Sequence, residues 1–291
     1  MAAAADHQSV QLGHVRAVIW DLDGTLYEDT HHFDYYADRL AEALPPERRQ
    51  AFHEAYRLAR DGGHALRVGT VYDTVRDRIL TVQGGAVVEV RTWAGEVLAP
   101  EVWREDYPAP VAVDHQRLYN VGDFWWLCAA CAAHFGLSQE QTLAAFLATR
   151  EYMTKPEFRL SPVPGLAETL AALRRAGIVQ VLATNSPRPD SETLLEKLGL
   201  AGAFDLCFFE TYKPAGMARV LAALAEKYGI PATAVLSVGD NYLNDLDPIA
   251  RAGGQTIFID PHGAGSQGPC TCRVQRVADV VSLLQPDALL R

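Results

Sequence analysis

Two acidic residues at the end of an apolar stretch are the residues of this chain best suited to chemistry. Asp21 and Asp23 follow the apolar run Val18-Ile19-Trp20, and Gly24-Thr25 comes directly after them. A short run of this kind is typical of a buried strand. Two ionised carboxylates buried without partners carry a large desolvation cost, which a hard cation with oxygen ligands relieves. The stretch therefore predicts a metal-dependent site.

Further polar groups follow three later apolar stretches. They are Thr184 and Asn185 after Val179–Ala183, Lys213 after Phe204–Phe209, and Asp240 with Asp245 after Ala234–Val238. Ligands of open α/β sheets bind at the carboxyl ends of the strands, so we expect these side chains to converge with Asp21 and Asp23. Carboxylates around a hard cation, with a hydroxyl and an ammonium group for anionic oxygens, favour phosphoryl transfer.

The second half of the chain predicts the sheet that would bring these groups together. From Pro164 onward, strand-like stretches alternate with helical stretches that end at glycines, namely Gly177, Gly199, Gly229 and Gly253. Regular alternation of strands and helices predicts a parallel sheet covered on both faces. We therefore expect an α/β fold, a Rossmann-like doubly wound parallel sheet.

The first strand, Val15–Trp20, is far from the rest of this sheet in the sequence. The stretch between Thr25 and about Leu160 is too long for a loop, which predicts an inserted domain. We expect residues 1–28 and 160–291 to form the α/β core and residues 29–159 to form a mostly helical cap. The predicted cap helices are Phe33–Leu44, Pro46–Gly62, Val71–Leu80, Leu118–Phe135 and Ser138–Tyr152, the last beginning with the capping box Ser138-x-x-Gln141.

One part of the insert has the pattern of strands. Gly84-Gly85 precedes the β-branched stretch Ala86–Trp93, Ala94-Gly95 can turn the chain, and Glu96–Leu98 can return it. This pattern predicts a short β-hairpin near residues 86–98. Two interpretations are open: a surface excursion, or a flap that contacts substrate or a second copy of the chain.

The composition limits the class of partner. The formal net charge is −10, which argues against nucleic acid as the principal partner because phosphate neutralisation needs clustered basic residues. No stretch approaches the length of a membrane span, and the first sixteen residues lack the apolar core of a signal peptide. The five cysteines are an odd number, so we expect no disulfide framework and a reducing, cytoplasmic location.

The spacing of two cysteines also invites a zinc interpretation. Cys128-x-x-Cys131 is followed by His134, but the surrounding Phe124-Trp125-Trp126-Leu127 is typical of a buried helix. Cysteine in such a helix behaves as a small hydrophobic residue. A zinc site would also need cysteines from the far end of the chain, so we favour the core interpretation.

Taken together, the motifs resemble those of the haloacid dehalogenase-like hydrolase superfamily. The four motifs occur in the order of that superfamily, and the similarity covers about Val15–Thr30 and Val163–Val281. The motifs are Asp21-Leu22-Asp23-Gly24-Thr25, then Thr184, then Lys213-Pro214, then Gly239-Asp240-x-x-x-Asn244-Asp245. The insert corresponds to the cap, which in this superfamily closes over the site and selects the substrate.

The resemblance implies the catalytic roles of four residues. Asp21 is the nucleophile that becomes an aspartyl-phosphate, and Asp23 is the general acid and base. A second carboxylate at the position of Asp23 marks the phosphotransferase branch, and the dehalogenase branch lacks it. Thr184 hydrogen-bonds a phosphoryl oxygen, and Lys213 balances the charge of nucleophile and phosphate.

The resemblance also implies a magnesium ion. Its ligands are Asp21, the backbone carbonyl of Asp23, Asp240 and, directly or through water, Asp245. Asn185 is a candidate substrate-binding residue beside Thr184 and Lys213, although a hydrogen bond within its own loop is an equally good interpretation. Candidate contacts in the cap, most of which fit core packing at least as well, are His31, His32, Tyr35, Tyr36, Arg91 and Trp93.

We therefore expect a Mg²⁺-dependent phosphatase that hydrolyses a small soluble phosphomonoester through an aspartyl-phosphate. A phosphomutase of the same superfamily acting on a sugar phosphate is one alternative. A nucleotide 5′-monophosphatase is another, suggested by Leu26-Tyr27 after the first motif. A non-catalytic binding protein is the alternative from a different class, and the complete set of motif residues argues against it.

Overall fold

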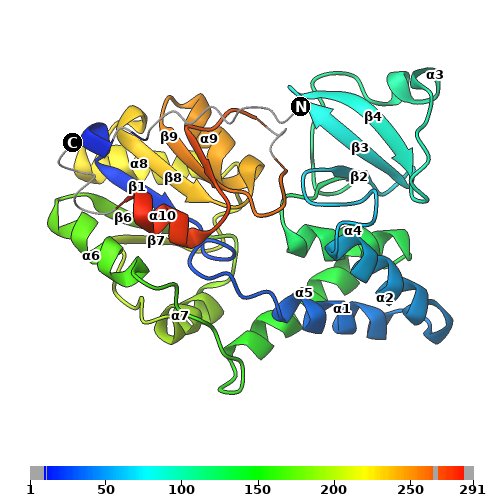
Figure 1. The fold of residues 1–291 in the computed structure, drawn as a ribbon, viewed down its shortest axis with the longest axis horizontal. Helices are drawn as coiled ribbons and strands as arrows, with labels where there is room; N and C mark the ends of the chain where they lie inside the picture. Colours follow the sequence, from blue (N-terminus) through cyan, green and yellow to red (C-terminus); the bar gives the residue numbers. More distant parts are fainter. Residues whose placement is uncertain (1–9, 11, 265–267, 285–291) are drawn as a thin grey trace. The chain divides into compact units, whose positions relative to one another are not determined.

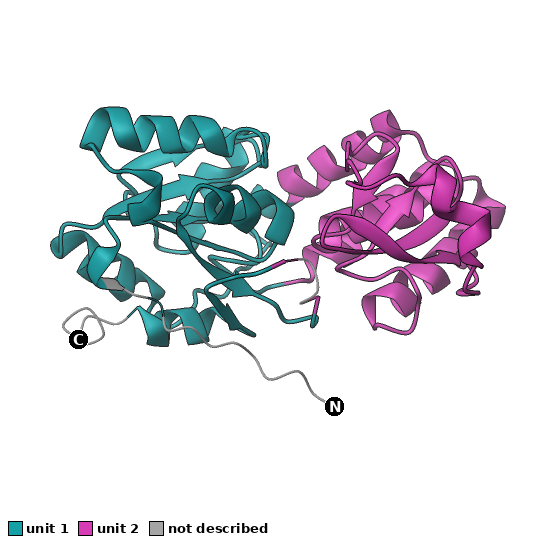
Figure 2. Ribbon diagram, turned by 90° about the horizontal axis from the view of Figure 1, so that it is seen from above, with its two compact units in different colours: residues 1–29, 153–263, 269–291 teal, residues 30–152, 264–268 magenta. Residues whose placement is uncertain are grey.

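The structure, a computed structural model, describes residue 10 and residues 12–264 and 268–284. The expectation about a signal peptide therefore falls largely outside the described residues. The chain forms two compact units (Figure 2). Unit 1 is Met1–Asp29, Met153–Gly263 and Pro269–Arg291, and unit 2 is Thr30–Tyr152 with Ala264–Gly268.

Unit 1 is built on a parallel sheet of six strands, which confirms the predicted fold class. The strand order is β10-β9-β8-β1-β6-β7, and every neighbouring pair is parallel. The strands are β1 Ala17–Trp20, β6 Val179–Ala183, β7 Leu206–Phe208, β8 Val235–Gly239, β9 Gln255–Ile259 and β10 Cys272–Val274. The first strand of the chain thus lies in the middle of the sheet, and Ile19 is paired with Val181 on one side and Ser237 on the other.

Helices cover both faces of this sheet. They are α6 Leu166–Arg175, α7 Arg188–Lys197, α8 Met217–Tyr228, α9 Asp247–Arg251 and α10 Val277–Leu283. Figure 1 shows α6 and α10 on one face and α8 and α9 on the other. Ala17 and Ile19, on one face of the fully buried strand β1, pack with Met217 and Val220 of α8.

Hydrogen bonds within unit 1 fasten the two points where the chain leaves for the insert and returns. The Ser161 backbone N–H and hydroxyl donate to the two oxygens of Asp29 at 2.7 and 3.1 Å. The Lys197 ammonium donates to the carbonyls of Met153, Lys155 and Phe158 at 2.9, 2.6 and 3.0 Å. These contacts hold the outgoing and returning segments to unit 1.

Unit 2 combines helices with an antiparallel sheet of strand order β4-β3-β2-β5. Its helices are α1 His32–Ala43, α2 Pro46–Arg60, α3 Pro100–Trp103, α4 Phe124–His134 and α5 Gln139–Thr154, the last ending just inside unit 1. Its strands are β2 Val71–Asp73, β3 Arg78–Gln83, β4 Ala86–Thr92 and β5 Leu118–Asn120. The predicted capping box is confirmed, because Ser138 and Gln141 each donate a backbone N–H to the other's side chain at 2.9 and 3.2 Å.

Two of the helices predicted in this unit are wrong. The stretch Val71–Leu80 forms β2 and β3, because Asp73 Oδ1 accepts the backbone N–H groups of Val75 and Arg76 at 2.9 and 3.0 Å and fixes a turn. The helix predicted over Leu118–Phe135 starts only at Phe124, and Leu118–Asn120 belongs to β5. Asp123 caps that helix by accepting the Trp126 N–H at 3.0 Å.

The predicted hairpin exists, but with a different partner strand. Ala86–Thr92 pairs along its length with β3 through the turn at Gly84-Gly85. The predicted return strand Glu96–Leu98 forms a single antiparallel bridge, between Arg91 and Val97, with bonds from Thr92 N to Glu96 O and from Leu98 N to Val90 O at 2.9 and 2.8 Å. Because Val90 is fully buried, β4 belongs to a packed sheet and is more than a surface excursion.

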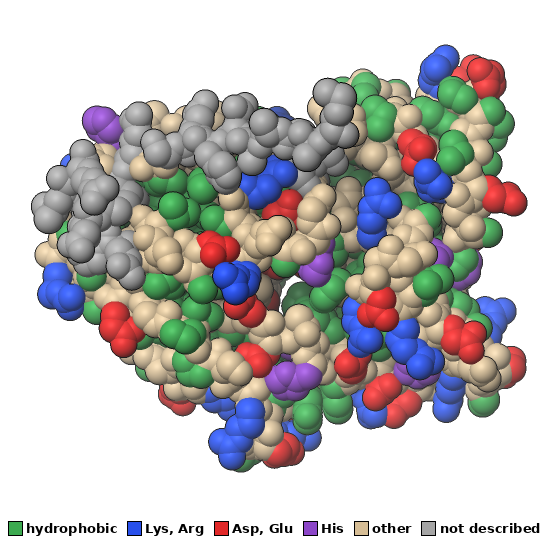
Figure 3. All heavy atoms as spheres, in the orientation of Figure 1, with side chains coloured by type: hydrophobic (Ala, Val, Ile, Leu, Met, Phe, Trp, Pro, Cys, Tyr) green, Lys and Arg blue, Asp and Glu red, His purple; other side chains and the backbone are tan. Residues whose placement is uncertain are grey.

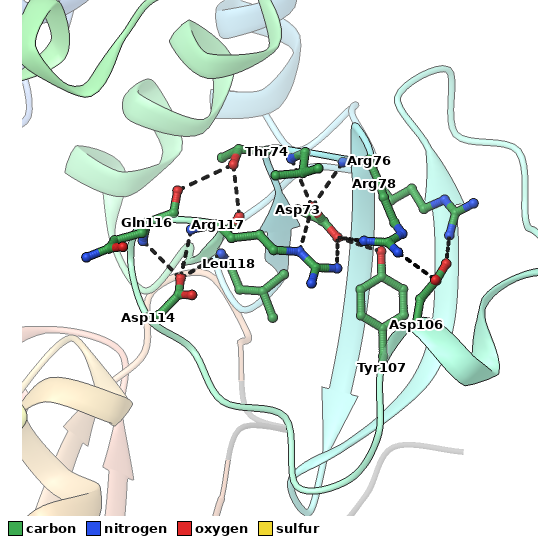
Figure 4. Close-up of polar contacts among 11 residues, drawn as sticks. Asp73, Thr74, Arg76, Arg78, Asp106, Tyr107, Asp114, Gln116, Arg117 and Leu118 are labelled. Carbon is green, nitrogen blue, oxygen red and sulfur yellow. Dashed lines mark hydrogen bonds and ion pairs between the residues drawn. The ribbon is translucent and has the colours of Figure 1, made fainter.

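Asp73 is the centre of a polar network in this sheet (Figure 4). Its buried carboxylate accepts the Tyr107 hydroxyl at 2.9 Å and the Arg117 guanidinium at 2.8 Å, in addition to the turn N–H groups. Burial by itself raises the pKa of Asp73, but the hydrogen bonds from Arg117, the Arg76 N–H and Tyr107 outweigh it and hold the pKa below its ordinary value. The network joins β2, β5 and the segment after α3.

We expect the Asp73→Asn variant to lower the free energy of unfolding of unit 2 by about 2 kcal/mol. The figure lies below the roughly 3–5 kcal/mol for breaking a fully buried pair, because Arg117 is partly exposed. Four of the five tryptophans (Trp93, Trp103, Trp125 and Trp126) belong to unit 2, so denaturation followed by tryptophan fluorescence reports on it.

The same denaturation experiment can be repeated at several pH values. A carboxylate with a lowered folded-state pKa stabilises the fold above its unfolded pKa, roughly 3.9, and loses that contribution as the pH falls through the folded value. The variant should therefore lose less stability than the wild type between neutral and acid pH. Asp38→Asn, at an exposed carboxylate of α1 in the same unit, is the control for a general loss of charge. Equal acid sensitivity of wild type and Asp73→Asn would contradict the assignment.

Candidate active site

The predicted site residues of unit 1 are positioned by the carboxyl ends of neighbouring strands. Asp21 follows β1 directly and donates its backbone N–H to Val238 O of β8 at 3.1 Å. Asp240 follows β8, and Thr184 follows β6. Because β1 lies between β6 and β8, these three ends are adjacent. The central strand and its two neighbours thus build one side of the site.

Lys213 connects two of the acidic residues. Its ammonium group donates to Asp21 Oδ1 and to Asp245 Oδ1, both at 2.6 Å, and all three side chains are buried. Asn185 holds the lysine segment, because its Oδ1 accepts the Lys213 backbone N–H at 2.7 Å. The structure therefore gives Asn185 the loop hydrogen bond that the sequence analysis left open beside substrate binding.

Three carboxylates of this site suit a hard cation. Asp21, Asp240 and Asp245 each offer an oxygen, and these oxygens lie within 4.8 Å of one another. Among the described residues, no other group of three or more His, Cys, Asp or Glu side chains is close enough together to hold an ion. Cys128 and Cys131 are buried in α4, in agreement with the core interpretation. An all-oxygen set is the donor chemistry that Mg²⁺ prefers, so the residues fit the implied ion.

Asp245 is held by its surroundings. It lies in the π-helix Tyr242–Leu246, a local geometry often found at functional sites. Its Oδ2 accepts the Asn241 N–H at 3.1 Å, and its backbone carbonyl accepts the Ser237 hydroxyl at 2.8 Å. The carboxylate is therefore preorganised both for Lys213 and for a cation.

The charge state of Asp21 depends on its neighbours. Burial raises its pKa to about 7, the Lys213 ammonium opposes this rise, and Asp245 and Asp23 add to it. Burial alone would lower the pKa of Lys213, but Asp21 and Asp245 reverse the direction and hold the lysine charged. A cation beside Asp21 would favour the ionised form of the carboxyl group.

Asp23 has two hydrogen-bond donors that the sequence analysis did not identify. The Ser186 hydroxyl donates to Oδ2 at 2.9 Å, and the Tyr27 hydroxyl donates to Oδ1. Ser186 in turn donates its backbone N–H to the Thr184 hydroxyl oxygen at 3.1 Å. The only sequence signals were the closeness of Tyr27 and Ser186 to motif residues.

The candidate contacts of the cap are used in packing within unit 2. His32 and Tyr36 are buried, and Trp93 stacks on His134 with ring centroids 3.7 Å apart. Tyr35 stacks on Tyr152 at 4.1 Å. Arg91 donates to Glu89 at 2.7 Å, and His31 lies just before α1. The core interpretation of the buried members is confirmed.

Gly24 allows the close approach of Asp240. Its φ is +76°, and a Cβ built there would collide with the Asp240 carboxylate. We expect Gly24→Ala to weaken Mg²⁺ binding by at least about tenfold, on the scale seen when a residue that orients a metal ligand is changed. Calorimetric titration with Mg²⁺ measures the effect.

Gly199→Ala is the matched control for this variant. Gly199 has a similar φ of +71° in unit 1, and nothing lies within 4 Å of its built Cβ. Both variants carry the strain of a left-handed alanine, about 1–2 kcal/mol, but only the first displaces Asp240. Equal Mg²⁺ affinities of the two variants would exclude Asp240 as a ligand.

Comparison with known proteins gives a family and a fold. A family model described as haloacid dehalogenase-like hydrolase matches residues 15–253. The sequence matches no curated protein. Among solved structures, the HAD hydrolase YfnB from Bacillus subtilis, crystallised with magnesium, is 14% identical with a TM-score of 0.52, and the match covers 93% of this chain and 99% of that one.

Two dehalogenases also match, at lower structural similarity. The L-2-haloacid dehalogenase from Xanthobacter autotrophicus is 18% identical with a TM-score of 0.45, covering 94% of this chain and 99% of that one. The L-2-haloacid dehalogenase RSc1362 is 19% identical with a TM-score of 0.46, covering 93% and 99%. At 14% identity, the similarity to YfnB concerns the fold alone.

Proposed function

Because the chain belongs to the haloacid dehalogenase-like hydrolase family, we propose that it is a Mg²⁺-dependent phosphatase acting on a small phosphomonoester. The observation that carries the proposal is the second carboxylate, Asp23, with a hydroxyl donor on each oxygen. Expulsion of an alkoxide, or of a phenolate of high pKa, is assisted by a proton, whereas a halide leaves without one. A positioned acid beside the nucleophile therefore supports phosphate ester hydrolysis over dehalogenation.

The proposed reaction has two steps. An Asp21 carboxylate oxygen attacks phosphorus while the bond to the ester oxygen breaks, and Asp23 gives its proton to that oxygen. Asp23 then takes a proton from water, whose oxygen attacks phosphorus and releases inorganic phosphate and the Asp21 carboxylate. Lys213 and Thr184 are the groups placed to stabilise the phosphoryl oxygens, and Mg²⁺ held by Asp21, Asp240 and Asp245 would offset the repulsion between carboxylate and phosphate.

The charge of the chain supports a small substrate over a polyanionic partner. Acidic and basic side chains are interspersed on the face drawn in Figure 3. The formal net charge of −10 also disfavours a polyanionic partner. Within the part of the chain that the structure describes, no helix has both the length and the apolar character that a membrane span requires.

The test measures two products in parallel. The purified protein is incubated with Mg²⁺ and a panel of sugar phosphates, nucleoside monophosphates and phosphorylated short acids, and separately with 2-haloacids. We expect inorganic phosphate from the first set, a strict need for Mg²⁺ and no halide from the second. Halide release without phosphate release would replace the proposal with dehalogenation. Conversion of a sugar 1-phosphate without phosphate release would identify a phosphomutase.

A further inference from the structure

We propose that Tyr27 and Ser186 are positioning residues that hold the Asp23 carboxyl group for proton transfer. The inference rests on the proposed phosphatase activity, in which Asp23 is the acid and base. The two hydroxyls bind different oxygens of the same carboxylate, Tyr27 to Oδ1 and Ser186 to Oδ2 at 2.9 Å. Two anchors on separate oxygens fix the plane of the carboxyl group as well as its position.

The two anchors are themselves rigid. Tyr27 is fully buried, and the backbone N–H of Leu26 donates to Leu22 O at 2.9 Å, which closes the loop between Asp23 and Tyr27. Ser186 is also buried, and its carbonyl accepts the Glu210 N–H at 3.1 Å. The anchors lie on the segments that follow two adjacent strands, Tyr27 after β1 and Ser186 after β6, so both approach Asp23 from the same edge of the sheet.

Hydroxyl anchors suit a group that gains and loses a proton. A hydroxyl donates to a carboxylate and, after rotation, accepts from a carboxylic acid. The heavy atoms therefore keep their places in both protonation states of Asp23. An amide N–H or a lysine ammonium at these positions can only donate, and would hold the ionised form alone.

The inference predicts a loss that depends on the leaving group. The Tyr27→Phe and Ser186→Ala variants keep Asp23 but release one oxygen each. We expect kcat/KM for phenyl phosphate, a poor leaving group, to fall by about 10²-fold in the double variant, the lower range for general acid catalysis. For 4-nitrophenyl phosphate, whose phenolate leaves without a proton, we expect a fall of less than about fivefold. kcat/KM reports the steps up to loss of the phenol, which makes it the right measure here.

Controls separate positioning from loss of folded protein. Tyr228→Phe and Ser282→Ala remove hydroxyls of unit 1 on α8 and α10, and both should leave the substrate ratio unchanged. Ser186→Thr keeps the hydroxyl and should restore the wild-type ratio. An equal fall for both esters in the anchor variants would overturn the positioning role, because a smaller active fraction lowers every substrate alike. If Tyr27→Phe does not fold, Ser186→Ala and Ser186→Thr decide the matter.

The same data separate the two proposals. Loss of phosphate release in Asp21→Asn with an unchanged ester ratio in the anchor variants would sustain the phosphatase and reject the positioning role. Phosphate release by Asp21→Asn at the wild-type rate would reject the phosphatase itself.

Discussion

Replacing Asp21 with asparagine should abolish turnover while leaving the protein folded. The amide keeps the shape of the side chain but cannot attack phosphorus, and loss of a catalytic nucleophile lowers kcat by roughly 10⁶-fold in well-studied hydrolases. In this variant Lys213 keeps its second partner, Asp245, at 2.6 Å, so no charge is left buried without a partner. We therefore expect a melting temperature close to that of the wild type. Phosphate release and thermal unfolding, measured on the same preparation, check both parts.

A direct readout supplements the rate. Acid quench of the wild type during turnover of a labelled phosphomonoester should trap label on the protein, and Asp21→Asn should trap none. Asp247→Asn is the control for an Asp to Asn change. Asp247 belongs to the same unit and forms an ion pair with Arg251 at the surface. Label on the Asp21→Asn protein would place the nucleophile elsewhere.

Replacing Lys213 with methionine should damage both activity and stability. The variant leaves Asp21 and Asp245 buried without the ammonium group that binds both at 2.6 Å. Removing one partner of a buried ion pair costs about 3–5 kcal/mol of folding stability. Loss of a charge that stabilises the transition state lowers kcat by about 10²–10³-fold. Chemical denaturation and phosphate release measure the two effects.

Mg²⁺ should have a different effect on the melting temperature of Lys213→Met than on that of the wild type. A cation bound by the same carboxylates would offset part of their repulsion, so Mg²⁺ should raise the melting temperature of Lys213→Met more than that of the wild type. Lys227→Met, at an exposed lysine of α8, is the control and should respond like the wild type. An equal Mg²⁺ response in all three proteins would contradict a shared site of Lys213 and the ion.

The catalytic unit could be predicted because a single geometric rule applies to it. Asp21, Asp240 and Lys213 each follow an apolar stretch, and a parallel sheet brings such ends together whatever the loops do. The rule gave the position of these residues without any knowledge of contacts. It also placed β1 in the sheet across a long insert, because the acidic residues at its end match the polar residues that follow the later strands.

The hydrogen-bond partners of Asp23 and the strands of the insert could not be predicted, because they depend on contacts between residues far apart in the sequence. Ser186 follows β6 and Asp23 follows β1. Their spacing in the sequence does not indicate whether the serine hydroxyl binds this carboxylate or a phosphate. In the insert, Val71, Val75 and Ile79 fit a helical period, yet the Asp73 side chain binds the backbone of the next residues and turns the chain. The helical period of this stretch is therefore overridden by a turn. Hydrogen bonds from Tyr107 and Arg117, which are distant in the sequence, stabilise the Asp73 side chain that forms this turn.

The central place of β1 also sets the order in which the protein can assemble during synthesis. β1 emerges early, but both of its neighbours, β6 and β8, are translated after the whole of Thr30–Tyr152. The insert is continuous in sequence apart from a short later segment, so it can fold before β6 and β8 have been synthesised. In a nascent chain halted before Val235, the edge of β1 that pairs with β8 would therefore be unpaired. A hydrophobic strand with an exposed edge is prone to aggregation and is a target of chaperones.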